Sequence, residues 1–166
     1  MASTTAQSAG SLPSGLGVCT STPDVFYLPE LIFGGLVWIL VASSHVIPPN
    51  PLGWVMFVSV FCFIMTFLWL VIFVCGGHKN SGGWAAADFV YHFLAAFFYL
   101  SASVALAYVT CLYGTKQMTL LSSDFPDFDT YYKYYRIDIA AVVFSHITTL
   151  FYFIHGILSA IRWKSF

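Results

Sequence analysis

Charged residues are scarce in this chain. Its 166 residues include 6 Lys or Arg and 7 Asp or Glu, or 8% of the total, whereas soluble domains average about 25%. A soluble fold of this length needs more charge to cover its surface. The net charge of -1 provides no basic excess for a nucleic-acid partner. The composition therefore excludes an ordinary cytosolic enzyme, a disordered chain and a nucleic-acid binder, and it predicts a membrane protein.

Motifs that mark common catalytic sites are also missing. The sequence has no phosphate-binding loop, no Gly-x-Ser-x-Gly nucleophile motif and no His-Glu pair with metalloprotease spacing. It has no Asn-x-Ser/Thr glycosylation site, because Asn50 and Asn80 both fail the pattern. We therefore expect no enzymatic activity and no catalytic residues.

Long hydrophobic runs are what the chain has instead. Four segments contain the ~20 mostly apolar residues that a membrane helix requires: about 26–47, 52–75, 85–113 and 137–161. Barrel strands would be shorter and would alternate in polarity. The sequence thus predicts an all-α integral membrane four-helix bundle with antiparallel up-and-down spans. This domain covers residues 24–164 and follows a Ser- and Thr-rich tail, 1–23, that we expect to be disordered and cytosolic.

The predicted connections differ in length. Residues 48–51 include three prolines, which cannot continue a helix, so the first two spans form a tight hairpin. Residues 76–83 form a short Gly-rich loop, and residues 114–136 form a larger loop with an aromatic and basic run.

Charge alone does not orient these spans, because three Lys or Arg fall on each side. Arg162 and Lys164 flank Trp163 at the last membrane exit, as an interface anchor would, and this favours cytosolic termini. On that orientation, Cys19 and Cys75 are juxtamembrane candidates for S-palmitoylation. The alternative is that these cysteines are small buried apolar side chains.

Ionisable residues within membrane spans are functional candidates. Glu30, Asp88 and Asp138 fall at the predicted helix starts, where the helix dipole and free N–H groups favour an anion, so we interpret them as helix-capping residues.

His92 and His155 are expected at similar depth, about 9–10 Å inside their helices at 1.5 Å per residue. With Glu30 and Asp88 they predict an intramembrane polar cluster, provided that the first, third and fourth helices pack together. Zinc needs three or four converging ligands. Haem needs a well-placed pair of histidines, and His146 has no partner with which to form such a pair. We therefore expect interhelical hydrogen bonds and no metal or haem site.

Small residues recur in the spans, adjacent in the first and at four-residue spacing in the third and fourth, which permits close helix approach. The candidates are Gly34, Gly35, Ser101, Ala105, Gly156 and Ala160. They indicate either packing within one chain or a face for self-association.

Several stretches together resemble a known family. They include Phe33-Gly-Gly-Leu-Val-Trp-Ile-Leu-Val-Ala-Ser-Ser44, Gly53-Trp-Val-Met-Phe-Val-Ser-Val-Phe-Cys-Phe63, Asp88-x-x-Tyr-His92 and Arg162-Trp-Lys-Ser165. This pattern is similar to the MARVEL-domain family of four-span membrane proteolipids, and the similarity extends over nearly the whole chain. The resemblance implies cytosolic termini and a trafficking role for Arg162, Trp163 and Lys164.

The resemblance also implies a function. Members organise membrane domains rich in cholesterol and glycosphingolipid, so these lipids are the expected ligands and no other cofactor is expected. Expected partners are membrane lipids, other copies of the chain in a homo-oligomer or cluster, and raft-associated membrane proteins, with no nucleic acid. The expected locations are the apical plasma membrane and trafficking vesicles or endosomes, including myelin or lymphocyte membranes. Two alternatives remain open: a small transporter or channel using Asp88, His92 and His155, and junctional adhesion through the loop 114–136.

Overall fold

The computed structural model describes residues 11–46, 49–120 and 128–166. Its elements are the 3-10 turns η1 (Gly15–Cys19) and η2 (Asp24–Phe26) and the helices α1 (Tyr27–Ser43), α2 (Pro49–Val74), α3 (Gly82–Leu120) and α4 (Phe128–Lys164). Among the described residues, segments 24–43, 50–74, 82–115 and 132–164 are long and apolar enough to cross a membrane. The predicted all-α four-span fold is therefore confirmed.

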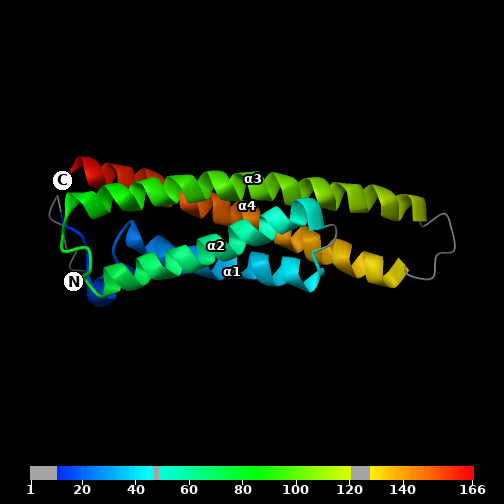
Figure 1. The fold of residues 1–166 in the computed structure, drawn as a ribbon, viewed down its shortest axis with the longest axis horizontal. Helices are drawn as coiled ribbons and strands as arrows, with labels where there is room; N and C mark the ends of the chain where they lie inside the picture. The colour runs from blue at the N-terminus through cyan, green and yellow to red at the C-terminus, as the bar shows by residue number, and fades with distance from the viewer. Residues whose placement is uncertain (1–10, 47–48, 121–127) are drawn as a thin grey trace, which may run out of the picture.

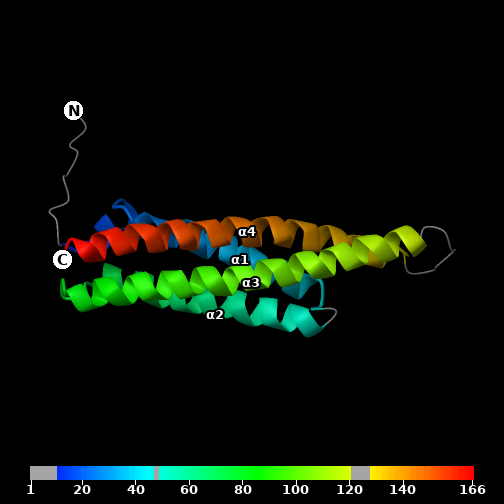
Figure 2. The ribbon, with the colours of Figure 1, turned by 90° about the horizontal axis from the view of Figure 1, so that it is seen from above.

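The four helices form a closed bundle with antiparallel neighbours (Figures 1 and 2). Helix α1 packs against α2 and α4, α2 packs against α3, and α3 packs against α4 along the longest contact. The apolar core combines Val37 of α1, Val58 of α2, Leu106 of α3 and Tyr152 of α4. The loop between α2 and α3 and the C-terminus lie at the same end of the bundle, which we call the terminal end.

Helices α3 and α4 are longer than the predicted spans. With 39 and 37 residues they measure about 58 Å and 55 Å, against about 30 Å of hydrocarbon. They extend well past the α1–α2 hairpin (Figure 1). The predicted loop 114–136 is therefore wrong where the structure describes it, because residues 114–120 and 128–136 are helical.

The physical reason is that hydropathy falls where a helix leaves the lipid, whereas the helix itself ends only where its backbone can no longer continue. Gly114 faces Tyr135 in this extension, and a Cβ at Gly114 would lie 3.1 Å from the Tyr135 hydroxyl oxygen. Helices α3 and α4 thus still pack closely beyond the predicted spans.

The prediction of a disordered tail is wrong for residues 11–23, while residues 1–10 lie outside the described part. Leu12 and Val18 are buried against Tyr27, Phe73 and Ala85 at the terminal end. The Leu12 backbone N–H donates to Asn80 Oδ1 at 2.7 Å. The prediction rested on the average composition of residues 1–23, most of which are small or polar. That average does not reveal Leu12 and Val18, whose burial removes hydrophobic surface from water.

Candidate functional site

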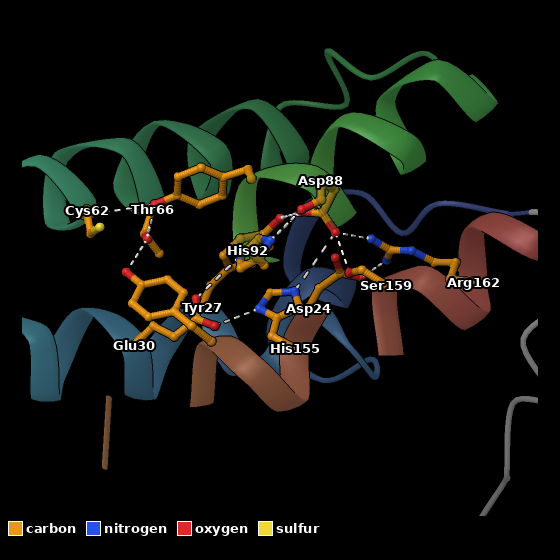
Figure 3. A network of polar contacts seen from close by, with 12 residues as sticks. Asp24, Tyr27, Glu30, Cys62, Thr66, Asp88, His92, His155, Ser159 and Arg162 are labelled. Atoms are coloured by element: carbon orange, nitrogen blue, oxygen red, sulfur yellow. Dashed lines mark hydrogen bonds and ion pairs between the residues drawn. The ribbon is translucent and has the colours of Figure 1, made fainter. Parts of the chain in front are cut away.

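Polar side chains from η2, α1, α3 and α4 meet inside the terminal end of the bundle (Figure 3). We call them the polar cluster: Asp24, Tyr27, Glu30, Asp88, His92, His155, Ser159 and Arg162. Seven of them are 0% exposed, and the Arg162 side chain is 8% exposed. The polar side chains of this cluster are therefore turned toward one another and away from lipid, as the cost of burying unpaired polar groups requires.

Helical periodicity places these side chains on inward faces. His155, Ser159 and Arg162 are spaced i, i+4, i+7 on α4, and Asp88 and His92 are spaced i, i+4 on α3. The two α4–α3 faces approach closely at Gly156, where a Cβ would lie 3.5 Å from the Phe93 backbone nitrogen. A glycine at this point lets the neighbouring His155 and Ser159 reach α3.

Asp88 accepts hydrogen bonds from three side chains on two other helices, α1 and α4. Tyr27 Oη donates to Oδ1 at 2.5 Å, and Ser159 Oγ donates to Oδ2 at 2.5 Å. Arg162 Nη2 donates to Oδ2 at 2.8 Å, while Nη1 donates to Asp24 Oδ2 at 2.6 Å. One guanidinium thus joins two buried carboxylates and ties the end of α4 to α3 and to η2.

Glu30 faces both histidines. His155 Nδ1 lies 2.9 Å from Glu30 Oε1, and His92 Nε2 lies 3.5 Å from Glu30 Oε2. The two imidazole rings pack with centroids 3.6 Å apart. Carboxylate and imidazole groups from α1, α3 and α4 therefore lie close together inside the bundle.

Helix α2 joins this region through a layer of hydroxyl groups. Thr66 Oγ1 lies 2.7 Å from both Tyr91 Oη and Tyr152 Oη, and Tyr91 Oη donates to the Cys62 carbonyl at 3.1 Å. All four helices are thereby connected by polar contacts at about the same level.

The structure brings together the four residues expected to form an intramembrane cluster, Glu30, Asp88, His92 and His155. It also brings together side-chain atoms that can ligate a metal ion. Ligand atoms of Glu30, His92 and His155 lie within 4.8 Å of one another, as do those of Asp24, Asp88 and His155.

The interpretation of the three acids as helix caps is wrong in its main part. Glu30 and Asp88 direct their carboxylates to side chains of other helices. Asp138 lies ten residues after the first residue of α4 and is buried, with Ser44 beside it. The error has a physical cause, since α4 begins well before the membrane span and Asp138 is therefore inside the helix.

The C-terminal anchor differs from its prediction at one residue. The Arg162 side chain points inward to Asp24 and Asp88, because these acids would otherwise lack a cation. Trp163 is exposed and its ring stacks on Phe89, with centroids 6.0 Å apart. Lys164 is exposed at the end of α4. The outward anchor thus consists of Trp163 and Lys164.

The small residues lie mostly in contacts within the chain. A Cβ at Gly34 would lie 3.0 Å from the Tyr99 hydroxyl oxygen, and one at Gly35 would lie 3.4 Å from the Phe63 ring. Ser101 is exposed and accepts a hydrogen bond from Trp54 Nε1 at 3.0 Å. Ala105 and Ala160 are half-buried. The glycines therefore serve helix packing inside the bundle.

Cys75 is exposed one residue after α2 ends, and Cys19 is half-buried in η1. We predict that Cys75 is S-palmitoylated in cells, because thioester formation requires an accessible thiol. Acyl exchange on protein purified from cells should therefore label Cys75, and Cys75→Ser should remove most of the signal. Buried Cys62 supplies the matched control, since Cys62→Ser is expected to leave labelling unchanged. An unchanged signal in Cys75→Ser would contradict the assignment.

Sequence reasoning missed Asp24, Tyr27 and Ser159, and it gave Arg162 another role. A signal for Ser159 and Arg162 was present in their i+4 and i+7 spacing from His155. Tyr27 likewise precedes Glu30 by three residues on α1. Asp24 lies in a 3-10 turn before the helix, where no periodic pattern points to it.

Known proteins resemble this chain along its whole length. The family model MARVEL, described as a membrane-associating domain, matches residues 19–158. The myelin and lymphocyte proteins of Homo sapiens and Canis lupus familiaris are each 47% identical to it, and the alignments cover 99% of both chains. Plasmolipin of Danio rerio is 36% identical over 55% of this chain and 54% of its own.

No solved structure matches the chain. The family model nevertheless covers α1, α2, α3 and most of α4. These are the helices that the sequence resemblance had indicated, and the resemblance is confirmed. The chain is therefore a multi-pass membrane protein that belongs to the MARVEL family of membrane-associating domains.

Proposed function

We propose that this chain is a non-enzymatic organiser of membrane domains rich in cholesterol and glycosphingolipid. The observation that carries the proposal is that the bundle encloses its polar cluster at the terminal end and presents an apolar exterior. The titratable side chains of the polar cluster are enclosed, whereas large apolar side chains cover the outside of the spans, among them Ile32, Phe67, Phe97 and Leu150. The outer surface of the spans, which faces lipid, is thus available for function.

The outward surface is not smooth. A shallow apolar hollow between α3 and α4 is lined by Phe93, Ala96, Phe97, Leu100, Thr149, Leu150 and Phe153. A rigid, mostly apolar molecule such as a sterol fits such a surface better than a flexible unsaturated chain does, because it loses less conformational entropy on binding. This hollow supports cholesterol as a ligand.

The relatives named myelin and lymphocyte protein support myelin or lymphocyte membranes as the place of action. We propose further that the termini are cytosolic, that the chain resides in apical plasma membrane and in trafficking vesicles or endosomes, and that it associates there with other copies and with raft-associated proteins. Mismatch between helix and bilayer contributes only fractions of a kcal/mol per Å. Sorting therefore requires clusters of chains, whose weak preferences combine.

We predict that the purified chain enriches in the ordered phase of vesicles containing saturated phosphatidylcholine, unsaturated phosphatidylcholine and cholesterol. A photoreactive sterol should label peptides of α3 and α4, and Phe97→Ala with Phe153→Ala should reduce that labelling several-fold, because both rings line the hollow. The matched control is Phe67→Ala, an equally exposed ring on α2 outside the hollow. Exclusion from the ordered phase at every protein density would refute the proposal.

The polar cluster favours a transporter as the second candidate. On the side of Thr66 away from the terminal end, however, the core continues with apolar residues such as Val37, Leu106 and Val109. The same vesicles distinguish the two functions, since ion flux that His92→Ala abolishes would favour transport.

A further inference from the structure

Two closely packed imidazoles at the centre of the polar cluster lie between two carboxylates (Figure 3). At one end, Glu30 is 2.9 Å from His155 Nδ1 and 3.5 Å from His92 Nε2. At the other end, Asp88 is 3.2 Å from His92 Nδ1 and 4.0 Å from His155 Nε2. Each ring thus presents one nitrogen to Glu30 and the other to Asp88, and all four side chains are 0% exposed.

The contact between His92 and Glu30 leaves both facing atoms without a hydrogen-bond partner in the described part of the chain, and with a neutral imidazole both are acceptors. His92 Nδ1 lies 2.8 Å from the Asp88 carbonyl oxygen, so Nδ1 carries the ring proton, and Nε2 of a neutral ring has a free lone pair. That lone pair faces Glu30 Oε2, and neither atom has a hydrogen-bond partner among the described residues. Two buried lone pairs that face each other are unfavourable unless a proton or a metal cation lies between them.

The charges of the cluster indicate the charge that this cation carries. Asp24, Glu30 and Asp88 bring three negative charges, and Arg162 is the cation bonded to two of them. With neutral imidazoles the cluster carries a net charge of -2 in a medium that stabilises isolated charge poorly. A single divalent ion would neutralise it.

We propose that Glu30, His92 and His155 bind one divalent transition-metal ion of the zinc class. Their ligand atoms gather within 4.8 Å of one another, near enough for small side-chain shifts to bring each of them to about 2.0–2.2 Å from a common ion. Two imidazoles with one carboxylate form a set that zinc accepts, whereas calcium and magnesium prefer oxygen ligands.

Asp88 supports this set from the far side of both rings. Ring N–H groups of metal-bound histidines characteristically donate to a carboxylate or carbonyl oxygen, which fixes the tautomer and the orientation of the ring. His92 Nδ1 has this arrangement, with both the Asp88 carbonyl and the Asp88 carboxylate beside it. The ligands come from α1, α3 and α4, so the ion joins three helices at the terminal end and acts as a structural clamp.

The test uses the full chain, purified in mild detergent without a histidine tag and stripped with a chelator. Titration with Co²⁺ should produce the visible absorption of protein-bound cobalt, saturating at about one ion per chain, and Zn²⁺ should displace it. Added Zn²⁺ should also raise the melting temperature of the stripped protein. These measurements need no variant, so they do not depend on how a substituted chain folds.

Variants locate the site. His92→Ala and His155→Ala should each weaken Co²⁺ binding by at least about tenfold and should remove the effect of Zn²⁺ on melting. His146→Ala is the matched control, because His146 lies on α4 but is exposed, and its ring nitrogen pairs with the Val142 carbonyl of its own helix. Absence of saturable Co²⁺ and Zn²⁺ binding would overturn the proposal and would assign the neutralising charge to protons on the two histidines. Equal binding in His92→Ala, His155→Ala and wild type would also overturn it.

Discussion

Replacing Arg162 with leucine is expected to destabilise the folded bundle by about 3 kcal/mol, toward the lower end of the range for removing one partner of a buried ion pair. The guanidinium bonds to Asp24 at 2.6 Å and to Asp88 at 2.8 Å, and both acids are 0% exposed. The Arg162 side chain is 8% exposed, so some water reaches the pair and the largest values are not expected. The free energy of unfolding can be measured by steric trapping in bicelles.

The matched control is Lys164→Leu, two residues further along the same helix end. Lys164 is exposed, and substitutions at such surface positions usually stay within about 0.5 kcal/mol. Combining Arg162→Leu with Asp24→Asn should recover part of the loss, since one of the two unpaired charges is then absent. Equal stabilities of Arg162→Leu and Lys164→Leu would show that the buried pairs do not hold the terminal end together.

Hydropathy predicted the number, type and order of the helices because lipid leaves a backbone few alternatives. Each span must satisfy its own N–H and C=O groups, so a long apolar run becomes a helix. The same argument says nothing about a helix outside the lipid. Helix α3 therefore ends at Leu120, well beyond the predicted end at 113, and α4 begins at Phe128, well before the predicted start at 137.

The depth of the polar cluster along the helices was predictable, whereas the rotation of each helix about its axis was less so. Counting residues from the helix ends placed His92 and His155 at one level, which a rise of 1.5 Å per residue makes reliable. Which side chains meet at that level also depends on how each helix is rotated about its axis. Arg162 illustrates the point, because its position at a membrane exit indicates an outward anchor while its periodicity with His155 places it on the inward face.

The enclosed polar cluster and the apolar outer surface of the spans depend on each other. Enclosing Glu30, Asp88 and their partners leaves the outer surface of the spans to side chains such as Phe97 and Leu150, which lipid tolerates at no cost. A change that separated α3 from α4 would expose both the cluster and the floor of the apolar hollow. The close approach of these two helices is therefore the part of the fold on which the proposed lipid contact and the proposed metal site both rest.

That approach depends on Gly156, and Gly156→Leu is expected to cost roughly 2–3 kcal/mol of stability, as overpacking of a well-filled core does. A Cβ at this position would lie 3.5 Å from the Phe93 nitrogen and 3.7 Å from the His92 carbonyl carbon. These are backbone atoms of α3, which cannot rotate away, so the further carbons of leucine must push the helices apart. Steric trapping measures the loss of stability.

Two glycine substitutions control for the change of residue type. Gly156→Ala adds only a Cβ at ordinary contact distance, so it should stay within about 1 kcal/mol of wild type. Gly53→Leu places the same leucine in α2 where nothing lies within 4 Å, and its higher helix propensity favours the fold by up to about 1 kcal/mol. If Gly156→Leu left the stability of the single chain intact and weakened only its self-association, Gly156 would belong to a contact between copies. The expected loss in the monomer would instead place it at the α3–α4 contact, one turn or less from His155 and Ser159.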